Sequence, residues 1–149
     1  MNRNYVLFLV VWLTFAARVS AQITPSDDEY APLVLVRIIP MSGVEGRFDH
    51  MAVDNATGRV FASNYGNDSV EVLSAQRGKR IHSIQGGFSK PQMVVYIPES
   101  NRIVVSNEGD GSCKILDADT YKLIDTVKYS EDADQIRYDP AAKRIYVGY

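Results

Sequence analysis

Met51-Ala-Val-Asp-Asn-Ala-Thr-Gly-Arg-Val-Phe-Ala-Ser-Asn64 recurs further along the chain, and this repetition decides the fold. Aligned beneath it, Met93-Val-Val-Tyr-Ile-Pro-Glu-Ser-Asn-Arg-Ile-Val-Val-Ser-Asn107 has one more residue, which we assign to the turn. A third copy, Ile136-Arg-Tyr-Asp-Pro-Ala-Ala-Lys-Arg-Ile-Tyr-Val-Gly-Tyr149, covers half of the unit. The spacing of about 42 or 43 residues is typical of propeller blades made of four short strands. Because such a unit cannot bury its own faces, the repeat predicts units stacked side by side.

Each full repeat contains four strand-like runs separated by turn residues. The runs are Met51–Val53, Arg59–Ser63, Ser69–Leu73 and Lys79–Ile84 in the first repeat, and Met93–Tyr96, Arg102–Ser106, Ser112–Leu116 and Lys122–Val127 in the second. Apolar residues alternate with polar ones along these runs, as they do on strands with one buried face. No run has a helical period. The sequence predicts an all-β fold, a partial β-propeller with blades at 48–88 and 90–131 and an incomplete blade at 133–149.

Two stretches of the repeats resemble a known family. They are Val60-Phe-Ala-Ser-Asn-Tyr-Gly-Asn-Asp-Ser-Val-Glu-Val-Leu73 and Ile103-Val-Val-Ser-Asn-Glu-Gly-Asp-Gly-Ser-Cys-Lys-Ile-Leu-Asp117. Both are similar to the repeat of YVTN-type β-propellers, in which a strand ending in Asn precedes a Gly-containing turn and a Val-x-Val-Ile-Asp strand. Gly46–Asp54 and Asp134–Pro140 resemble exported, YncE-like members, and the resemblance covers residues 33–149. Ser74 departs from the pattern, which has Asp there.

The third repeat stops halfway, at Tyr149. Propellers close into rings of about four to eight blades. We therefore expect an open arc of about two and a half blades and a partial sequence, the alternative being a chain that completes the ring with copies of itself. Leu33–Ile39 is β-branched and bounded by prolines, and its place before the first repeat predicts the strand that closes the ring in a longer protein. In this chain we expect that strand to lack its ring partner.

The N-terminal segment predicts export. Arg3 precedes the apolar run Val6–Ala17, and Val19-Ser20-Ala21 has the small-x-small pattern of a signal-peptidase site. The run is shorter than the ~20 residues that a membrane span needs. We expect a signal peptide at 1–21, a polar leader at 22–32, no stable membrane span after cleavage, and a periplasmic or extracellular protein.

Charge and cysteine content narrow the function classes. Without the signal peptide the chain has 14 basic residues (16 minus Arg3 and Arg18) against 18 acidic ones, and no basic run remains. This balance argues against nucleic acid as a partner. Cys113 has no second cysteine with which to form a disulfide. It replaces Val70 in the repeat, so we expect a small buried hydrophobic residue.

Polar residues before the first strand of each repeat are the candidate ligand-binding positions. In a blade, the first strand lines the central channel, and the residues before it surround one mouth. Asp49-His50, Pro91-Gln92 and Asp134-Gln135 occupy this place, and Arg137 follows within the third repeat. The alternative is that they hydrogen-bond strand ends or line a water-filled channel. Alternation along a strand predicts that the Asp49 and His50 side chains point to opposite sides.

The turn residues have a structural interpretation. Asp54 and Asp139 occupy the same turn, and we expect their carboxylates to accept hydrogen bonds from backbone amides. Asn64 and Asn107 close the second strand of each repeat, and we expect a turn role for both. We find no catalytic, metal-ligand or phosphate-loop motif, and we predict no cofactor.

The sequence therefore predicts an exported, non-enzymatic scaffold that binds a small molecule or a protein of unknown identity. The alternative is part of a lactonase-like or quinoprotein-type propeller enzyme whose site needs further blades.

Overall fold

The computed structural model describes residues 33–149, so the predicted signal peptide at 1–21 and leader at 22–32 lie outside the described residues. The strands are β1 (Phe48–Asp54), β2 (Arg59–Asn64), β3 (Ser69–Ser74), β4 (Lys79–Gln85), β5 (Pro91–Ile97), β6 (Arg102–Asn107), β7 (Ser112–Asp117), β8 (Leu123–Lys128), β9 (Gln135–Asp139) and β10 (Arg144–Gly148). Two short 3-10 turns, η1 (Tyr65–Asn67) and η2 (Pro98–Ser100), follow β2 and β5. Residues 33–149 contain no helix long and apolar enough to cross a membrane.

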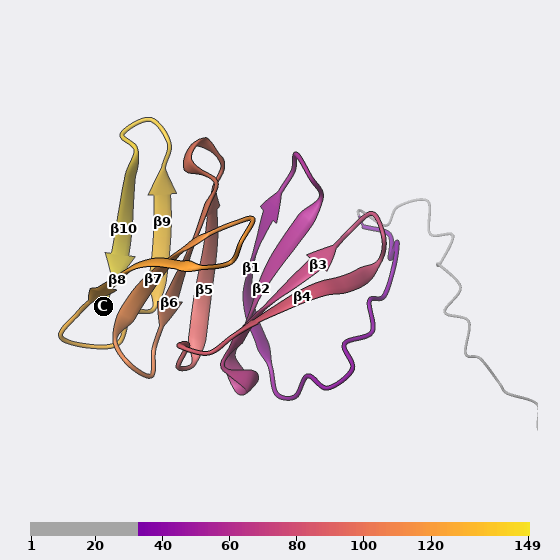
Figure 1. The fold of residues 1–149 in the computed structure, drawn as a ribbon, viewed down its shortest axis with the longest axis horizontal. Coiled ribbons are helices and arrows are strands. Elements are labelled where there is room, and N and C mark those ends of the chain that lie inside the picture. Colours follow the sequence, from indigo (N-terminus) through magenta and orange to yellow (C-terminus); the bar gives the residue numbers. More distant parts are fainter. Residues whose placement is uncertain (1–32) are drawn as a thin grey trace, which may run out of the picture. The chain divides into compact units, whose positions relative to one another are not determined.

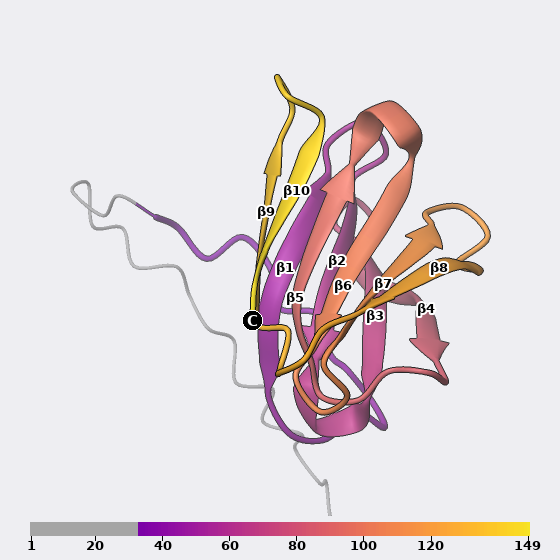
Figure 2. The ribbon, with the colours of Figure 1, turned by 90° about the vertical axis from the view of Figure 1, so that its left-hand side faces the viewer.

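The strands form three antiparallel sheets, so the all-β prediction is confirmed. Sheet 1 has the order β1-β2-β3-β4, sheet 2 has the order β5-β6-β7-β8, and sheet 3 pairs β9 with β10. Each strand pairs with its neighbour in sequence, because tight turns join antiparallel strands. The first strands of the sheets, β1, β5 and β9, lie next to one another (Figure 1, Figure 2). The three sheets are blade-like and form no closed ring within residues 37–149.

The strand pairing corrects the alignment of the repeats. The turns after the first strands join Asp54 to Arg59, Ile97 to Arg102 and Asp139 to Arg144, and all three have the same length. The prediction of an extra turn residue in the second repeat was therefore wrong. The pairing places Val94, not Met93, at the position of Met51. Met51 pairs with Ala62 and Val94 pairs with Val105, and each partner lies two residues before the Asn that ends its strand. Two methionines suggested the wrong register, whereas backbone hydrogen bonds set the true one.

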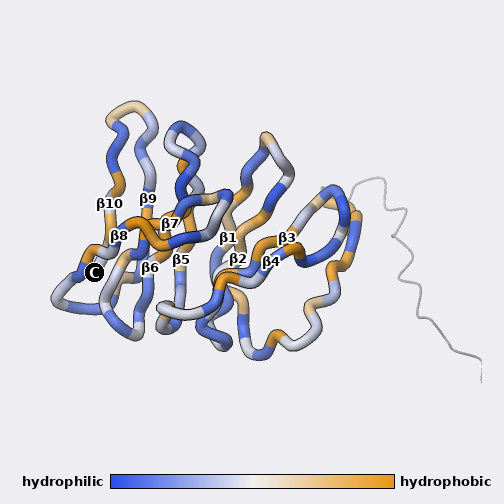
Figure 3. Tube along the Cα trace, in the orientation of Figure 1, coloured by the Kyte–Doolittle hydropathy of each residue, from blue (hydrophilic) through white to orange (hydrophobic). Residues whose placement is uncertain are grey.

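Two hydrophobic clusters fill the spaces between the sheets. The first joins sheets 1 and 2 and contains Phe61, Val70, Val72, Ile84, Phe88, Val94, Ile103, Val105, Leu116 and Ala118. The second joins sheets 2 and 3 and contains Met93, Ile97, Val104, Cys113, Ala133 and Ile136. The hydrophobic stretches drawn in orange in Figure 3 lie mostly along the strands. Burial of these faces stabilises each sheet against its neighbour, as the repeat pattern predicted.

The turn prediction for the two aspartates is confirmed. Asp54 Oδ1 accepts hydrogen bonds from the amides of Ala56 and Thr57, at 3.0 and 3.4 Å. Asp139 Oδ1 accepts from the amides of Ala141 and Ala142 at 2.9 and 3.1 Å. These carboxylates satisfy backbone donors that the turn leaves without a strand partner.

Leu33–Ile39 forms no strand in the structure. A β-branched run predicts extended structure only where a neighbouring strand supplies backbone hydrogen bonds. The exposed apolar residues of this segment are Leu33, Val34, Leu35, Val36 and Ile38. The strand predicted at 33–39 is therefore not found in the structure.

Candidate functional site

One end of the sheets is built on a repeated Asn-x-Gly sequence. Asn64 and Asn107 are the last residues of β2 and β6, and both are completely buried. With its amide nitrogen turned toward the chain before β1, Asn64 donates to the carbonyl oxygens of Glu45 and Arg47 at 3.2 and 3.3 Å. In sheet 2, Asn107 Oδ1 accepts from the Ser89 amide at 3.2 Å. Each asparagine thus holds the segment that enters its own sheet. The expected turn role is confirmed for Asn107, whose Nδ2 also donates to the Ser112 carbonyl across the turn at 3.3 Å, but not for Asn64, which makes no side-chain hydrogen bond to the turn that follows it.

The glycine of the sequence is required by close packing of the same segments. A Cβ on Gly66 would lie 2.7 Å from Cα of Gly46, which is too close for any other residue without a backbone shift. A Cβ on Gly109 would collide with the Ser89 hydroxyl, a side-chain group that can rotate away, so the steric requirement for glycine is stricter at Gly66. Asn and Gly are therefore structural, and the residue between them, Tyr65 or Glu108, is held at the end of the sheets. We call this end the rim.

A β-bulge places the candidate polar residues at the rim. Between Phe48 and Met51 the pairing of β1 with β2 gains one residue, and the same irregularity occurs between Pro91 and Val94 in sheet 2. The corrected alignment puts Asp49, Gln92 and Asp134 at one equivalent position, and all three are partly exposed. His50, Met93 and Gln135 follow at the next position. Asp49, His50, Gln92 and Gln135 thus lie within the strands and not before them.

The bulge also overturns the prediction that Asp49 and His50 point apart. His50 Nδ1 lies 2.9 Å from Asp49 Oδ1, because the extra residue interrupts the alternation of side chains. This atom is buried and has no hydrogen-bond partner of acceptable geometry, whereas the His50 side chain as a whole is 41% exposed. Asp49 Oδ2 instead accepts from the Arg47 guanidinium at 3.2 Å. The His50 imidazole therefore lies against the Asp49 carboxylate at the rim, with its Nδ1 atom closed off from solvent.

A polar network crosses from sheet 1 to sheet 2 at the rim. Glu108 is its centre: Oε1 accepts from the Tyr65 hydroxyl at 3.2 Å, and Oε2 accepts from Gln92 Nε2 at 2.7 Å. Lys90 Nζ lies 3.7 Å from Glu108 Oε1. The guanidinium carbon of Arg47 lies 4.2 Å from the centre of the Tyr65 ring, a distance suited to a cation–π contact.

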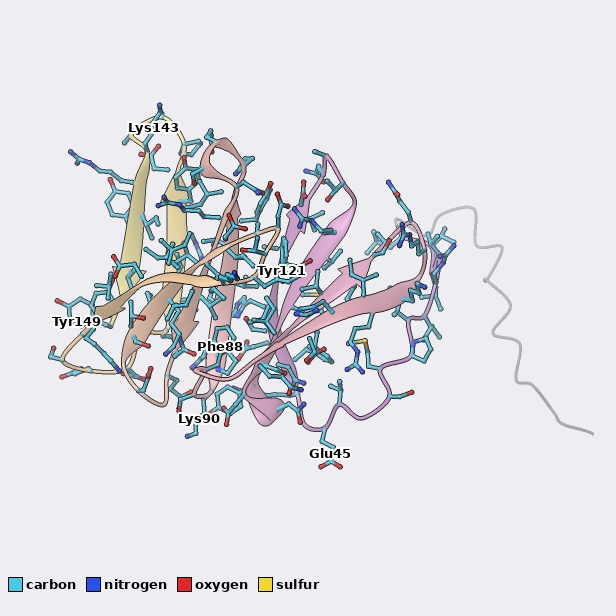
Figure 4. The ribbon with its side chains drawn as sticks, in the orientation of Figure 1. Glu45, Phe88, Lys90, Tyr121, Lys143 and Tyr149 are labelled. Atoms are coloured by element: carbon cyan, nitrogen blue, oxygen red, sulfur yellow. The ribbon has the colours of Figure 1, made fainter. Side chains whose placement is uncertain are left out.

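The network has a consistent electrostatic effect on Lys90. The Tyr65 hydroxyl, and next the negative charge of Glu108, raise the pKa of Lys90. Its ammonium group is therefore charged at neutral pH. In Figure 4, Lys90 and Glu45 lie at the same end of the sheets, and Lys143 lies at the opposite end.

Sheet 3 contributes the third equivalent position. The Asp134 amide donates to the Gly148 carbonyl at 3.0 Å, and the Asp134 carbonyl accepts from the Ser106 hydroxyl at 2.8 Å. The backbone of Asp134 is thereby fixed against sheet 2 while its side chain stays partly exposed. Ser63 occupies the position of Ser106 in sheet 1, and its buried hydroxyl has no hydrogen-bond partner among the described residues.

Arg137 does not belong to the rim. It lies further along β9 and lines an open groove of about 340 Å³ formed by β1, β5 and β9. The other lining residues are Met51, Ala52, Val53, Met93, Val94, Val95, Tyr96, Ile136 and Tyr138. The structure thus separates the candidates into a polar rim and an apolar groove with a single charge.

Tyr65, Glu108, Lys90 and Arg47 are rim residues that sequence reasoning missed. Two of them could have been identified from the sequence, because Tyr65 and Glu108 occupy the variable position of a repeated Asn-x-Gly sequence. A position that varies between two structural residues is free to carry function. Within residues 33–149, no three His, Cys, Asp or Glu side chains are arranged to hold a metal ion.

Comparisons with known proteins support the fold but do not indicate a function. No protein-family model matches the chain, and no curated protein matches it. Among solved structures, it is similar to Kuenenia stuttgartiensis hydrazine synthase, with a TM-score of 0.63 and 20% sequence identity over 70% of this chain. The chain spans about 30% of the length of that structure's chain. At this level of identity the similarity concerns the arrangement of the strands and not the chemistry.

Proposed function

We propose that this chain forms blades of an exported β-propeller of the YVTN type, and that it is a non-enzymatic scaffold that binds a small molecule or a protein at the rim. The blade-like sheets with neighbouring first strands support the propeller assignment. The apolar N-terminal run and the Val-Ser-Ala sequence support export.

The observation that carries the binding proposal is the equivalence of Asp49, Gln92 and Asp134. Three sheets present a polar, partly exposed side chain at the equivalent position, which lies within β1 and β5 and directly before β9. Convergent polar groups on rigid strands are the usual form of a binding site. Turns and caps do not need these side chains, since Asn64 and Asn107 already hold the incoming segments.

The charges at the rim favour a polar ligand with both donors and acceptors. Asp49 and Asp134 supply acceptors, whereas Arg47 and Lys90 supply cations that already have internal partners. Gln92 can donate and accept. Such a mixed set suits hydroxyl and amide groups better than a single strong charge.

The proposal is tested by screening the full chain against a library of polar fragments with amide-resolved NMR. We expect hits to shift the signals of residues 47–50, 90–92 and 134–135 together. Asp49→Asn and Gln92→Ala should weaken these hits by about threefold to tenfold, the effect of losing one or two hydrogen bonds. Asp125→Asn, an exposed aspartate on β8, is the matched control and should leave them unchanged. Hits that shift other regions only, or that are indifferent to both rim variants, would contradict the proposal.

A further inference from the structure

We infer that the groove beyond the rim binds a small organic carboxylate with an apolar body, and that Arg137 holds its carboxylate group. The inference deepens the proposed function and rests on its binding-scaffold part. It begins with the lining of the groove, which contains one charged side chain, that of Arg137. The walls are mainly aliphatic, with Met51, Val53 and Val95 partly or largely exposed toward solvent.

The hydrogen-bonding capacity of Arg137 is mostly unused. Both of its contacts among the described residues are made by Nη1, which donates to the Ile136 carbonyl at 2.8 Å and approaches Met93 Sδ at 3.2 Å. No carboxylate pairs with Arg137 within residues 33–149, whereas Arg47 and Arg80 each pair with one carboxylate and Arg59 pairs with two. The Nε and Nη2 edge is therefore free, and this edge has the spacing that binds the two oxygens of a carboxylate.

The contacts of Nη1 orient the guanidinium without neutralising it. A carbonyl oxygen and a thioether sulfur carry no net charge, and the thioether is a weak acceptor. The charge on Arg137 thus remains available to a ligand. Because the guanidinium is held at one nitrogen, less side-chain freedom is lost when a second partner binds.

The other polar groups of the groove are already engaged. The Tyr96 hydroxyl lies 3.1 Å from Asn101 Oδ1, and the Tyr138 hydroxyl lies 3.2 Å from Glu99 Oε2. Both donate away from the groove, toward the turns at its far end. A ligand that enters the groove therefore finds one free charged group and an aliphatic surface.

Size and charge together select the ligand class. A groove of about 340 Å³ is at the small end of the range for small-molecule sites. One guanidinium without a second cation matches one negative charge, which favours a carboxylate over a phosphate dianion. The aliphatic walls favour a ligand whose remaining atoms are apolar.

The experiment compares hexanoate with hexanamide, which has the same size and no charge. Each is titrated into the full chain while the Met93 methyl signal and the Arg137 side-chain signal are followed by NMR. We expect hexanoate to bind about threefold to tenfold more tightly than hexanamide, the range for a charge-assisted hydrogen bond at a partly exposed site. Arg137→Gln should remove this preference, and Arg137→Lys should keep part of it because the charge remains without the paired donors.

Arg144→Gln is the matched control, since Arg144 is an exposed arginine on β10 that does not line the groove. It should preserve the preference for hexanoate. An unchanged amide spectrum of each variant will show that its fold is intact. Equal binding of the two probes, absence of hexanoate binding, or a preference that survives Arg137→Gln would overturn the inference. Fragment hits at the rim without any hexanoate preference would overturn this inference alone, whereas hexanoate binding without rim hits would overturn the rim proposal alone.

Discussion

The space between sheets 1 and 2 is filled more completely than the space between sheets 2 and 3. Equivalent residues show the difference. Val72 and Ile84 of sheet 1 are 0% and 6% exposed, whereas their counterparts in sheet 2, Ile115 and Val127, are half-buried and 41% exposed. Near the first strands the two spaces are alike, since Val70 and its counterpart Cys113 are 0% and 2% exposed.

The number of strands in the covering sheet explains this difference in burial. Sheet 2 covers sheet 1 with four strands, but sheet 3 has two, β9 and β10, and these cover only the inner part of the face of sheet 2. The same sequence pattern therefore produces a buried residue in one sheet and an exposed one in the next. Alternation identifies which face a residue occupies, and the neighbouring sheet decides whether that face is covered.

A buried ion pair in sheet 1 also distinguishes the contact between sheets 1 and 2 from the contact between sheets 2 and 3. Asp54 is 1% exposed, and its carboxylate lies 3.0 Å from the Arg59 guanidinium. Arg59 also contacts the Ala118 carbonyl and Asp119, so it joins sheet 1 to sheet 2. At the position of Asp54, sheet 2 has Ile97, and no equivalent pair joins sheets 2 and 3 in the described residues.

The strongest test of the comparison uses the equivalent pair Ile84 and Val127. Ile84→Ala should lower the free energy of unfolding by about 2–4 kcal/mol, because it opens a cavity in a covered face. Val127→Ala should cost less than about 1 kcal/mol, because this residue is 41% exposed. Urea unfolding of the full chain followed by far-UV circular dichroism measures both. Similar costs at the two positions would show that the outer face of sheet 2 is covered in solution, and the comparison would fail.

The next test uses pH. Burial by itself would raise the pKa of Asp54, but hydrogen bonds from Thr57 and then Arg59 outweigh it and hold that pKa below its ordinary value. The folded state therefore favours the ionised carboxylate. This contribution is fully present above the ordinary aspartate pKa of about 4 and is lost as the pH falls through the lower, folded value.

Asp54→Asn should remove this part of the acid dependence and cost about 2–3 kcal/mol at neutral pH, since Arg59 loses a buried partner. Asp119→Asn is the control. Its side chain is 67% exposed and its contact with Arg59 should contribute less than about 1 kcal/mol. Unfolding curves between pH 3 and 7 test both variants. Equal losses for Asp54→Asn and Asp119→Asn would mean that burial does not strengthen the contact of Asp54 with Arg59.

The smallest expected effect concerns Cys113. Burial raises the pKa of its thiol to about 11, so the thiolate is nearly absent at neutral pH. A bulky thiol reagent should therefore label the native chain slowly. Cys113→Ser should cost about 1–3 kcal/mol because it buries a hydroxyl, and Cys113→Val should be tolerated because Val70 fills the same position in sheet 1. Rapid native labelling would show that sheet 3 does not cover the inner part of this face.

Much of the fold was predictable because the relevant signals are local. Turn residues such as Asp54 and Asp139 form hydrogen bonds with amides two and three residues away, so a short sequence is enough to identify them. The strands follow from alternation over a few residues. The burial of Cys113 followed from its equivalence with Val70, and the structure confirms it.

The candidate site was less predictable because it depends on register and on contacts between sheets. A bulge moves Asp49 and His50 into β1 and brings their side chains together, and no composition rule marks its position. The contact of Tyr65 with Glu108 joins residues 43 apart in the sequence. Arg137 was chosen as a rim candidate, but its place along β9 assigns it to the groove.

The sequence by itself determined the repeated four-stranded unit, its turns and the all-β class, since backbone hydrogen bonds between adjacent strands and the alternation of side chains act over short distances. The tertiary structure alone decided which faces are covered, which polar residues meet at the rim and which cation stands alone in the groove. Those properties depend on how neighbouring sheets pack. Val72 and Ile115 have nearly the same local sequence pattern, and they differ in burial because only one of them faces a four-stranded sheet.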